Sequence, residues 1–276
     1  MLSSTRKTLA PRAPGAPHRA AGQRSTAALA VRRLLVIAVL IAVWQVCVLS
    51  GIAPALLPRM DDVAVAFVTI LTRAEFWQAL LQTVSAALAG VAIATVVGVP
   101  LGLLLGALPA AERSARLVLD FGRSFPVIAV LPVLILILGA TWRMEVLVVA
   151  LAAVWPILIQ SLDGAKQMTS SAREMTRSYK IPPFLAFRRV LLPSALPMIS
   201  TGLRISIAIA ILVAVAVEIL SQTPGLGRLI TLAQGGARWD LAIAYLILIG
   251  AFGWAVTSFL AWAESRLLRW NRRGEA

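Results

Sequence analysis

The sequence is short of the residues that most enzymes use for acid–base, thiol or metal chemistry. Among 276 residues there is one cysteine, Cys47, inside an apolar run, and one histidine, His18, in a segment rich in proline, alanine and arginine. A lone cysteine cannot form a disulfide within the chain, and no cysteine–histidine cluster is present that could bind a metal. The Gly-x-x-x-x-Gly-Lys-Ser/Thr motif is also missing, so ATP hydrolysis by this chain is not expected. We predict no enzyme, metal site or cofactor.

Charged residues are scarce as well. They make up 14% of the chain against 59% hydrophobic residues, and the mean hydropathy is +0.87. A soluble domain carries roughly 25% charged and about 45–50% apolar residues, so much of this chain is expected to face lipid. The net charge of +14 would suit a nucleic-acid-binding protein only if the basic residues shared one solvated face. They fall in clusters between apolar runs, which argues against a nucleic-acid partner.

Six apolar segments are long enough to cross a bilayer as helices, which takes roughly 17–25 residues. Their expected limits are 34–50, 79–107, 117–138, 146–163, 195–220 and 241–262. The expected fold is an all-α polytopic membrane protein with six transmembrane helices. Residues 1–30 are predicted to be a disordered basic leader, residues 31–270 a single membrane domain and residues 271–276 a tail.

The positive charges predict how the chain is oriented in the membrane. If the N-terminus is inside, nineteen Lys and Arg residues fall in cytoplasmic segments and five in external ones. Because cytoplasmic loops carry an excess of Lys and Arg, both termini are expected in the cytoplasm. The first apolar run is longer than the core of a signal peptide, and no Ala-x-Ala site follows it before Pro54, so we interpret it as an uncleaved helix.

Small residues recur every four positions along the second predicted span, which places them on one face of a helix. Lipid gives helices no hydrophobic reason to associate, so close backbone contact must hold such helices together. We interpret this face as a packing seam, with the lining of a transport path as the alternative. Its members are Gly90, Ala94, Gly98, Gly102 and Gly106.

Four ionisable residues interrupt the predicted spans: Asp120 and Arg123 in the third, and Arg204 and Glu218 in the fifth. A charge at the bilayer centre costs about 2.5–3.5 kcal/mol, so such residues normally face protein or water. Asp120 and Arg123 are one helical turn apart, which predicts a local ion pair. Arg204 and Glu218 are too far apart on one helix to pair. They are expected either to make contacts between helices or to line a solute path.

The polar segment 170–193, between the fourth and fifth spans, is predicted to form two short helices. Ser170 or Ser171 can cap the first of them, with Glu174 in its first turn, where the helix dipole favours an acidic residue. Ile181-Pro182-Pro183 is expected to end this helix, because proline disfavours helical geometry in the residue before it. The segment is therefore more ordered than a loop that only supplies charge.

A second short amphipathic helix is expected from Phe184 to Leu192, with a basic face at Arg188 and Arg189. Such a basic surface would also suit lipid headgroups, which is a less specific interpretation. A capped helix, a double-proline break and aromatic residues in a polar segment favour a docking element for a cytoplasmic partner.

This segment resembles the EAA loop of ABC-importer permeases, whose pattern is Glu-Ala-Ala, three variable residues, glycine, nine variable residues and Leu-Pro. Glu174, Met175 and Thr176 occupy the Glu-Ala-Ala positions, Lys180 the glycine position, and Phe187-Arg188-Arg189-Val190-Leu191-Leu192-Pro193 the closing segment. In that family the loop forms a coupling helix that inserts into a groove of the ATPase subunit. A positive φ costs more free energy for lysine than for glycine, so we expect Pro182-Pro183 to make the turn instead.

Other stretches resemble the same family in the same order, especially its nitrate, taurine and aliphatic sulfonate subgroup. They are Leu57-Pro58 with Asp61-Asp62-Val63, residues 98–106, residues 123–132, Thr201-Gly202-Leu203-Arg204, Glu218 and Gly225-Leu226-Gly227. The similarity covers roughly residues 34–265.

The resemblance implies a type I ABC-importer permease in the bacterial inner membrane. It implies a second permease subunit, with a homodimer expected, a cytoplasmic ATPase dimer that binds ATP and Mg, and an extracytoplasmic solute-binding protein. The implied solute is small and anionic or zwitterionic, such as a sulfonate, taurine or nitrate. The alternative is a proton- or ion-coupled secondary transporter with Asp120 and Glu218 as relay groups, although the internal repeats of many such transporters are not visible.

Overall fold

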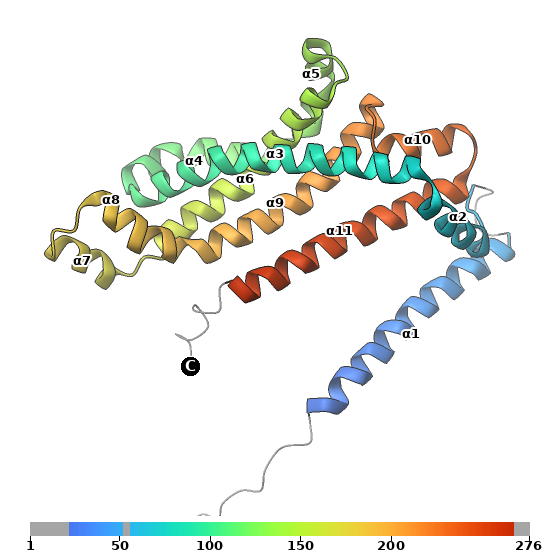
Figure 1. The fold of residues 1–276 in the computed structure, drawn as a ribbon, viewed down its shortest axis with the longest axis horizontal. Helices are drawn as coiled ribbons and strands as arrows, with labels where there is room; N and C mark the ends of the chain where they lie inside the picture. The colour runs from blue at the N-terminus through green and yellow to red at the C-terminus, as the bar shows by residue number, and fades with distance from the viewer. Residues whose placement is uncertain (1–21, 52–55, 268–276) are drawn as a thin grey trace, which may run out of the picture. The chain divides into compact units, whose positions relative to one another are not determined.

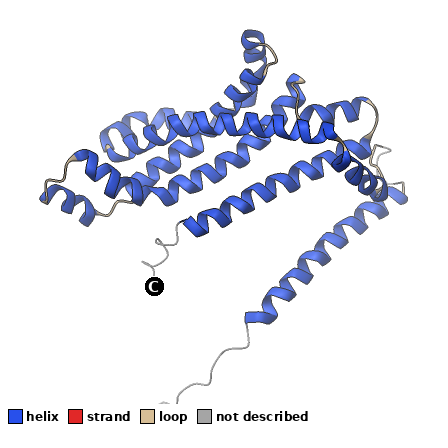
Figure 2. Cartoon of the chain, in the orientation of Figure 1, coloured by secondary structure: helices blue, strands red, loops and turns tan. Residues whose placement is uncertain are grey.

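The computed structural model describes residues 22–51 and 56–267, and all regular structure in these ranges is helical (Figure 2). The chain divides into two compact units, residues 1–55 and residues 56–276. In the first unit, helix α1 runs Gly22–Leu49 and is apolar enough to cross a membrane from Val31 onward. Most of the predicted leader, residues 1–21, and the predicted tail at 271–276 lie outside the described residues.

The second unit contains all the remaining elements (Figure 1). In chain order they are α2 Met60–Thr72, α3 Ala74–Ala107, α4 Pro109–Ser124, the 3-10 turn η1 Val127–Val130, α5 Leu131–Leu138, α6 Trp142–Lys166, α7 Ser170–Ser178, α8 Pro183–Ala186, the π-helical turn η2 Phe187–Leu191, α9 Leu192–Ser221, α10 Leu226–Gly235 and α11 Trp239–Leu267. Within the described residues, five helical stretches are long and apolar enough to span a membrane, and the bent pair of α4 with η1–α5 makes a sixth if counted as one.

The third predicted span, 117–138, differs from the expected continuous helix. The chain bends by 79° between α4 and η1–α5. Pro126 has no backbone N–H to continue the helix, and its ring holds Phe125 in extended geometry (φ −72°, ψ 124°). Proline therefore breaks the helix here and redirects the chain.

Helices α3, α6 and α9 lie side by side and form the main core (Figure 1). All five seam residues of α3 are buried, and the glycines show why no side chain fits. A Cβ on Gly90 would come within 2.8 Å of Val149 Cβ, and one on Gly102 would collide with the backbone of Leu158. On the other side of α6, the Ser206 hydroxyl of α9 donates a hydrogen bond to the Ala153 carbonyl (2.8 Å). Close backbone approach thus holds the three helices together.

A second hydrophobic cluster joins the N-terminal end of α3 to α2, α10 and α11. Ile70 of α2, Phe76 of α3, Leu226 of α10 and Tyr245 of α11 are all buried in it, and the rings of Phe76 and Tyr245 stack at 6.5 Å. The short helices α2 and α10 have no counterpart among the predicted spans, because both are too short to cross a bilayer.

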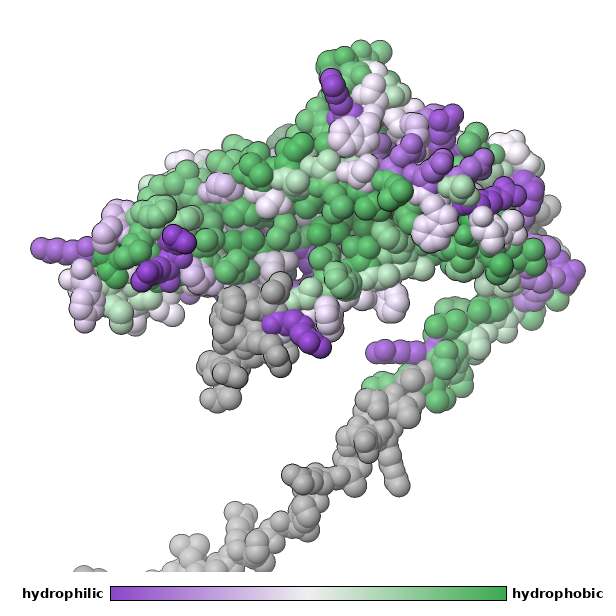
Figure 3. Space-filling view, viewed as in Figure 1, coloured by the Kyte–Doolittle hydropathy of each residue, from purple (hydrophilic) through white to green (hydrophobic). Residues whose placement is uncertain are grey.

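Apolar side chains cover much of the outside of the long helices in the second unit (Figure 3). Val96 of α3 and Leu212 of α9, for example, are 74% and 69% exposed. Hydrophilic side chains gather near α7 and α8 at one end of the helices and near α2 and α10 at the other. This is the distribution that a bilayer imposes, because lipid replaces water around the middle of each helix.

Candidate functional site

The segment predicted to dock a partner begins with helix α7, whose N-cap is Thr169. The Thr169 hydroxyl accepts a hydrogen bond from the Ala172 backbone N–H (3.2 Å), and Thr169 has the extended backbone that a cap requires (φ −59°, ψ 149°). The prediction of Ser170 or Ser171 as the cap was therefore wrong. Because α7 begins earlier than expected, Glu174 lies beyond its first turn.

The turn that ends α7 is made by Lys180, which has φ 49°. The Ile181 N–H bonds to the Thr176 carbonyl and the Lys180 N–H to the Arg177 carbonyl, both at 3.0 Å. These two bonds form a Schellman motif, which places its left-handed residue where glycine is usually found. The expectation that Pro182-Pro183 would make this turn was wrong, because Lys180 adopts the glycine-like geometry itself.

The exposed side chains of α7, the turn after it, α8 and η2 form what we call the docking surface. Its members are Glu174, Met175, Arg177, Tyr179, Lys180, Phe184, Phe187, Arg188 and Arg189. Three large side chains stand out, since Met175 is 58%, Phe184 73% and Tyr179 77% exposed. These residues alternate with basic ones, so a partner would need apolar pockets and acidic groups. Exposed apolar patches rimmed by polar residues are typical of protein–protein interfaces.

The docking surface is joined to the membrane part without a flexible linker. Residues 183–221 form one continuous helical stretch of 39 residues, in which η2 is a π-helical turn. The Leu192 N–H bonds to the Phe187 carbonyl, five residues back. Pro193 follows and has no N–H to give to the Arg189 carbonyl, which favours a wider turn here. Movement of α8 is therefore expected to reach α9 directly.

Arg204 forms an ion pair with Glu264, which links α9 to α11. The Arg204 Nη1 atom lies 3.2 Å from Glu264 Oε2, with the side chains 38% and 21% exposed. The Ser200 hydroxyl donates to Glu264 Oε1 (2.8 Å), and the Thr201 hydroxyl does so at 3.5 Å. Of the two roles expected for Arg204, the structure shows the contact between helices. Sequence reasoning missed Glu264, because it lies just past the predicted sixth span.

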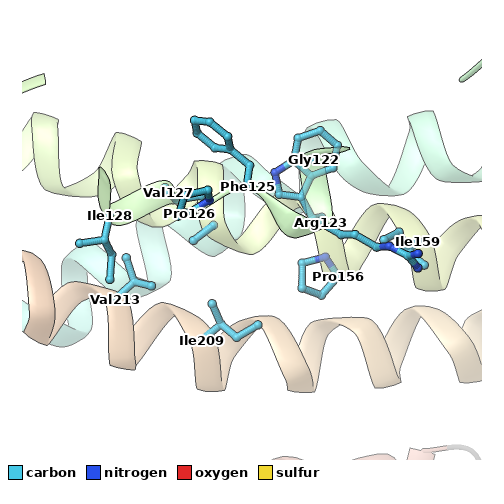
Figure 4. A pocket seen from close by; sticks show the side chains of 12 residues that line it. Gly122, Arg123, Phe125, Pro126, Val127, Ile128, Pro156, Ile159, Ile209 and Val213 are labelled. Atoms are coloured by element: carbon cyan, nitrogen blue, oxygen red, sulfur yellow. The ribbon is translucent and has the colours of Figure 1, made fainter. Parts of the chain in front are cut away.

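Asp120 and Arg123 pair on α4 as their spacing suggests, with Arg123 Nη2 3.0 Å from Asp120 Oδ1 and both side chains more than half exposed. Arg123 also borders a pocket between the α4–η1 break, α6 and α9 (Figure 4). The pocket has a volume of about 370 Å³. Its formation depends on Gly122, because a Cβ there would overlap the Trp155 ring.

Glu218 belongs to a buried polar cluster that joins α3, α6, α9 and α10. Its side chain is 0% exposed, and Glu218 Oε2 accepts a hydrogen bond from the Gly227 N–H (2.7 Å) at the start of α10. Thr83 Oγ1 of α3 accepts one from the Leu226 N–H (3.0 Å). Two side chains from other helices thus satisfy backbone donors in the first turn of α10 that have no partner within the helix. Glu218 serves as a cap and does not point to open space.

Glu145 of α6 is 2% exposed and interacts directly with the Glu218 carboxyl group. Sequence reasoning missed Glu145, because the predicted fourth span started one residue after it. Gly225 leaves room for the observed position of the Glu218 carboxyl group, since a Cβ there would overlap it. At the nearby α10–α11 turn, Arg238 donates hydrogen bonds to Asp240 (2.8 and 3.1 Å), which raise the pKa of the Arg238 guanidinium and keep this surface pair ionised.

Structural comparison shows the same fold in solved transporters. An inward-facing structure of the MetNI methionine ABC transporter superposes with a TM-score of 0.61 at 19% sequence identity. The match covers 71% of this chain and 95% of that chain. Together with the candidate membrane spans, it shows the type I ABC-importer permease architecture.

Sequence comparison identifies permease relatives. SsuC of Escherichia coli (strain K12), named for aliphatic sulfonates transport, is 30% identical over 233 residues, which are 84% of this chain and 89% of that protein. The nitrate import permease NrtB of a Synechocystis species is 29% identical over 243 residues (85% and 88%), and the taurine transport system permease TauC of E. coli is 27% identical over 241 residues (85% and 88%). The family model of the binding-protein-dependent transport system inner membrane component matches residues 98–269. The chain therefore belongs to this family, the multi-pass inner-membrane permeases of ABC importers.

Proposed function

We propose that this permease couples to a separate cytoplasmic ATPase subunit through the docking surface and forms the path for a small anionic or zwitterionic solute. The observation that carries the proposal is the exposed docking surface, whose α8 and η2 part belongs to a helical stretch that runs without interruption into α9. Relatives named for aliphatic sulfonates, taurine and nitrate support the choice of solute class.

ATP and Mg bind to the ATPase subunit, and closure of two such subunits pulls on α7 and α8. The π-helical turn passes this motion to α9, which packs against α6 along its length. The pair of Arg204 and Glu264 makes α11 follow α9. The seam between α3 and α6 keeps these two helices together, so that α3, α6, α9 and α11 move as a group. Such a rigid group suits the rocking motion of alternating access.

The assembly is a homodimer of this chain with an ATPase dimer below it and an extracytoplasmic solute-binding protein above it. Both termini and the docking surface face the cytoplasm, as the distribution of Lys and Arg residues indicates. An acidic rim around an apolar groove on the ATPase would complement the basic and aromatic side chains of the docking surface.

The test is co-purification of the permease with its ATPase, followed by ATP-dependent solute uptake into proteoliposomes. Reversal of charge by Glu174→Lys is expected to weaken the complex and uptake together, because it changes the docking surface. Glu75→Lys, an exposed reversal at the N-terminal end of α3, is the matched control and should leave both unchanged. Uptake that follows a proton gradient without any ATPase would reject the proposal and favour a secondary transporter.

A further inference from the structure

We propose that the pocket between the α4–η1 break, α6 and α9 binds an organic anion, with the anionic group at Arg123 and an apolar body against the walls. This inference rests on the proposed function and names the solute class and its site within the membrane part. The chemical class is an alkyl or aryl sulfonate, or a similar organic acid, and excludes a bare inorganic ion such as nitrate.

The lining of the pocket separates charge from apolar surface. Of the twelve described residues that line it, only Arg123 is charged, and the rest are apolar, aromatic or glycine. Figure 4 shows the Arg123 side chain extending beside Pro156 and Ile159, while Ile209 and Val213 of α9 lie on the other side of the space. A ligand with one anionic end and an apolar remainder matches this arrangement, because the guanidinium binds sulfonate or carboxylate oxygens with two parallel hydrogen bonds.

The volume favours an organic ligand over an inorganic ion. About 370 Å³ lies within the range of small-molecule sites, roughly 300–1,000 Å³. Nitrate has only four atoms, none of them apolar, and would leave most of this space empty and the apolar walls without contact. An alkyl chain of several carbons fills the space and removes apolar surface from water.

Fixed features of the backbone shape the pocket. The break at Phe125 and Pro126 bends the chain by 79°, and Val127 and Ile128 after the break line one side of the space. Gly122 leaves room for the Trp155 ring beside α4, since a Cβ there would overlap that ring. A cavity held open by a proline break and a glycine contact does not depend on a flexible loop and is formed before a ligand arrives.

Arg123 is available to a ligand despite its ion pair with Asp120. Both side chains are more than half exposed, so protein does not enclose the guanidinium, and its five N–H donors are not all used by one carboxylate. An anion in the pocket therefore competes with Asp120 for the guanidinium. This competition makes a directional prediction, because removing the charge of Asp120 should strengthen anion binding, whereas removing the charge of Arg123 should weaken it.

The test is isothermal titration calorimetry of the full-length permease in lipid nanodiscs, with butanesulfonate, nitrate and butan-1-ol as probes and empty nanodiscs as the blank. Arg123→Gln is expected to weaken butanesulfonate binding at least tenfold, and Asp120→Asn to strengthen it severalfold. Nitrate and butan-1-ol should bind at least tenfold more weakly than butanesulfonate. Binding that is unchanged in Arg123→Gln, equal for butan-1-ol, or absent in the unmodified protein overturns the inference. A change of butanesulfonate affinity in the same direction for both variants would also overturn the inference, because it would indicate that the ion pair is structural.

The result can be separated from the proposed function. ATP-dependent uptake is measured in parallel with the reconstituted complex of permease, ATPase and binding protein. Normal uptake by Arg123→Gln refutes the pocket as a solute site and leaves the permease function intact. Failure of the unmodified complex to use ATP for uptake refutes the proposed function, whatever the calorimetry shows.

Discussion

The backbone geometry of Lys180 allows a direct test of the turn that ends α7. Lys180 is one of three residues other than glycine with positive φ in the described part of the chain, and it closes the Schellman motif of α7. An L-residue in left-handed geometry pays roughly 1–2 kcal/mol, a penalty that glycine avoids. Glycine in turn loses about 0.5–1 kcal/mol more backbone entropy on folding. Lys180→Gly should therefore stabilise this turn by about 0.5–1 kcal/mol, a factor of roughly two to five in its closing equilibrium.

Amide hydrogen exchange followed by mass spectrometry measures this equilibrium. A peptide that covers residues 176–181 should exchange two- to fivefold more slowly in Lys180→Gly than in the unmodified protein. Lys180→Ala is the matched control, because it removes the charged side chain and keeps the Cβ that makes positive φ costly. Equal exchange in Lys180→Gly and the unmodified chain would refute the argument. Slower exchange in both variants would assign the effect to the lysine side chain instead.

Three further predictions concern the packing of the helices, each measured by thermal unfolding in detergent. Gly102→Ala should destabilise the protein by about 1–3 kcal/mol, because the added Cβ meets the backbone of α6. The control is Gly250→Ala, whose Cβ meets nothing within 4 Å and should leave the stability unchanged. Equal effects of the two substitutions would contradict the interpretation of Gly102 as part of a packing seam. Replacing Arg204 and Glu264 by Gln, singly and together, should give a coupling free energy of about 0.2–1 kcal/mol, which is small because Arg204 is partly exposed. Additive effects of the two single substitutions would mean that the ion pair contributes nothing to stability. Gly225→Ala should lower the free energy of unfolding by about 1–3 kcal/mol, because the added Cβ displaces the Glu218 carboxyl group that caps α10. An unchanged unfolding temperature would show that the Glu218 side chain can move aside without loss of stability.

The long apolar helices could be located from sequence because their signal is local. A run of about 20 apolar residues is long enough to cross the bilayer as a helix, in which every backbone group is satisfied within the segment. The order of α3, α6, α9 and α11 along the chain and the four-residue spacing of the seam follow from such local patterns. The exposed aromatic and basic residues of 170–193 are equally local, and they form a helical surface in the structure.

The contacts that sequence reasoning missed all join distant parts of the chain. Glu264 and Glu145 lie just outside the limits predicted for their spans, so neither was considered as a partner for Arg204 or Glu218. The break at Pro126 was also missed. Proline lies inside the continuous helices α3, α6 and α9 but breaks the helix at Pro126. Whether a proline breaks a membrane helix depends on whether neighbouring helices hold the chain straight. No single stretch of sequence carries that information.

The π-helical turn at Phe187–Leu191 has a geometric consequence for partner recognition. A π turn amounts to one residue inserted into an α-helix, and each residue of an α-helix rotates the direction of its side chain by about 100°. The angle at which Phe184 faces outward, relative to the buried face of α9, is thus set by this single insertion. Deleting one residue from the turn would rotate the docking surface around the helix axis and leave the membrane helices in register. Such a change would reorient the docking surface without repacking of the core.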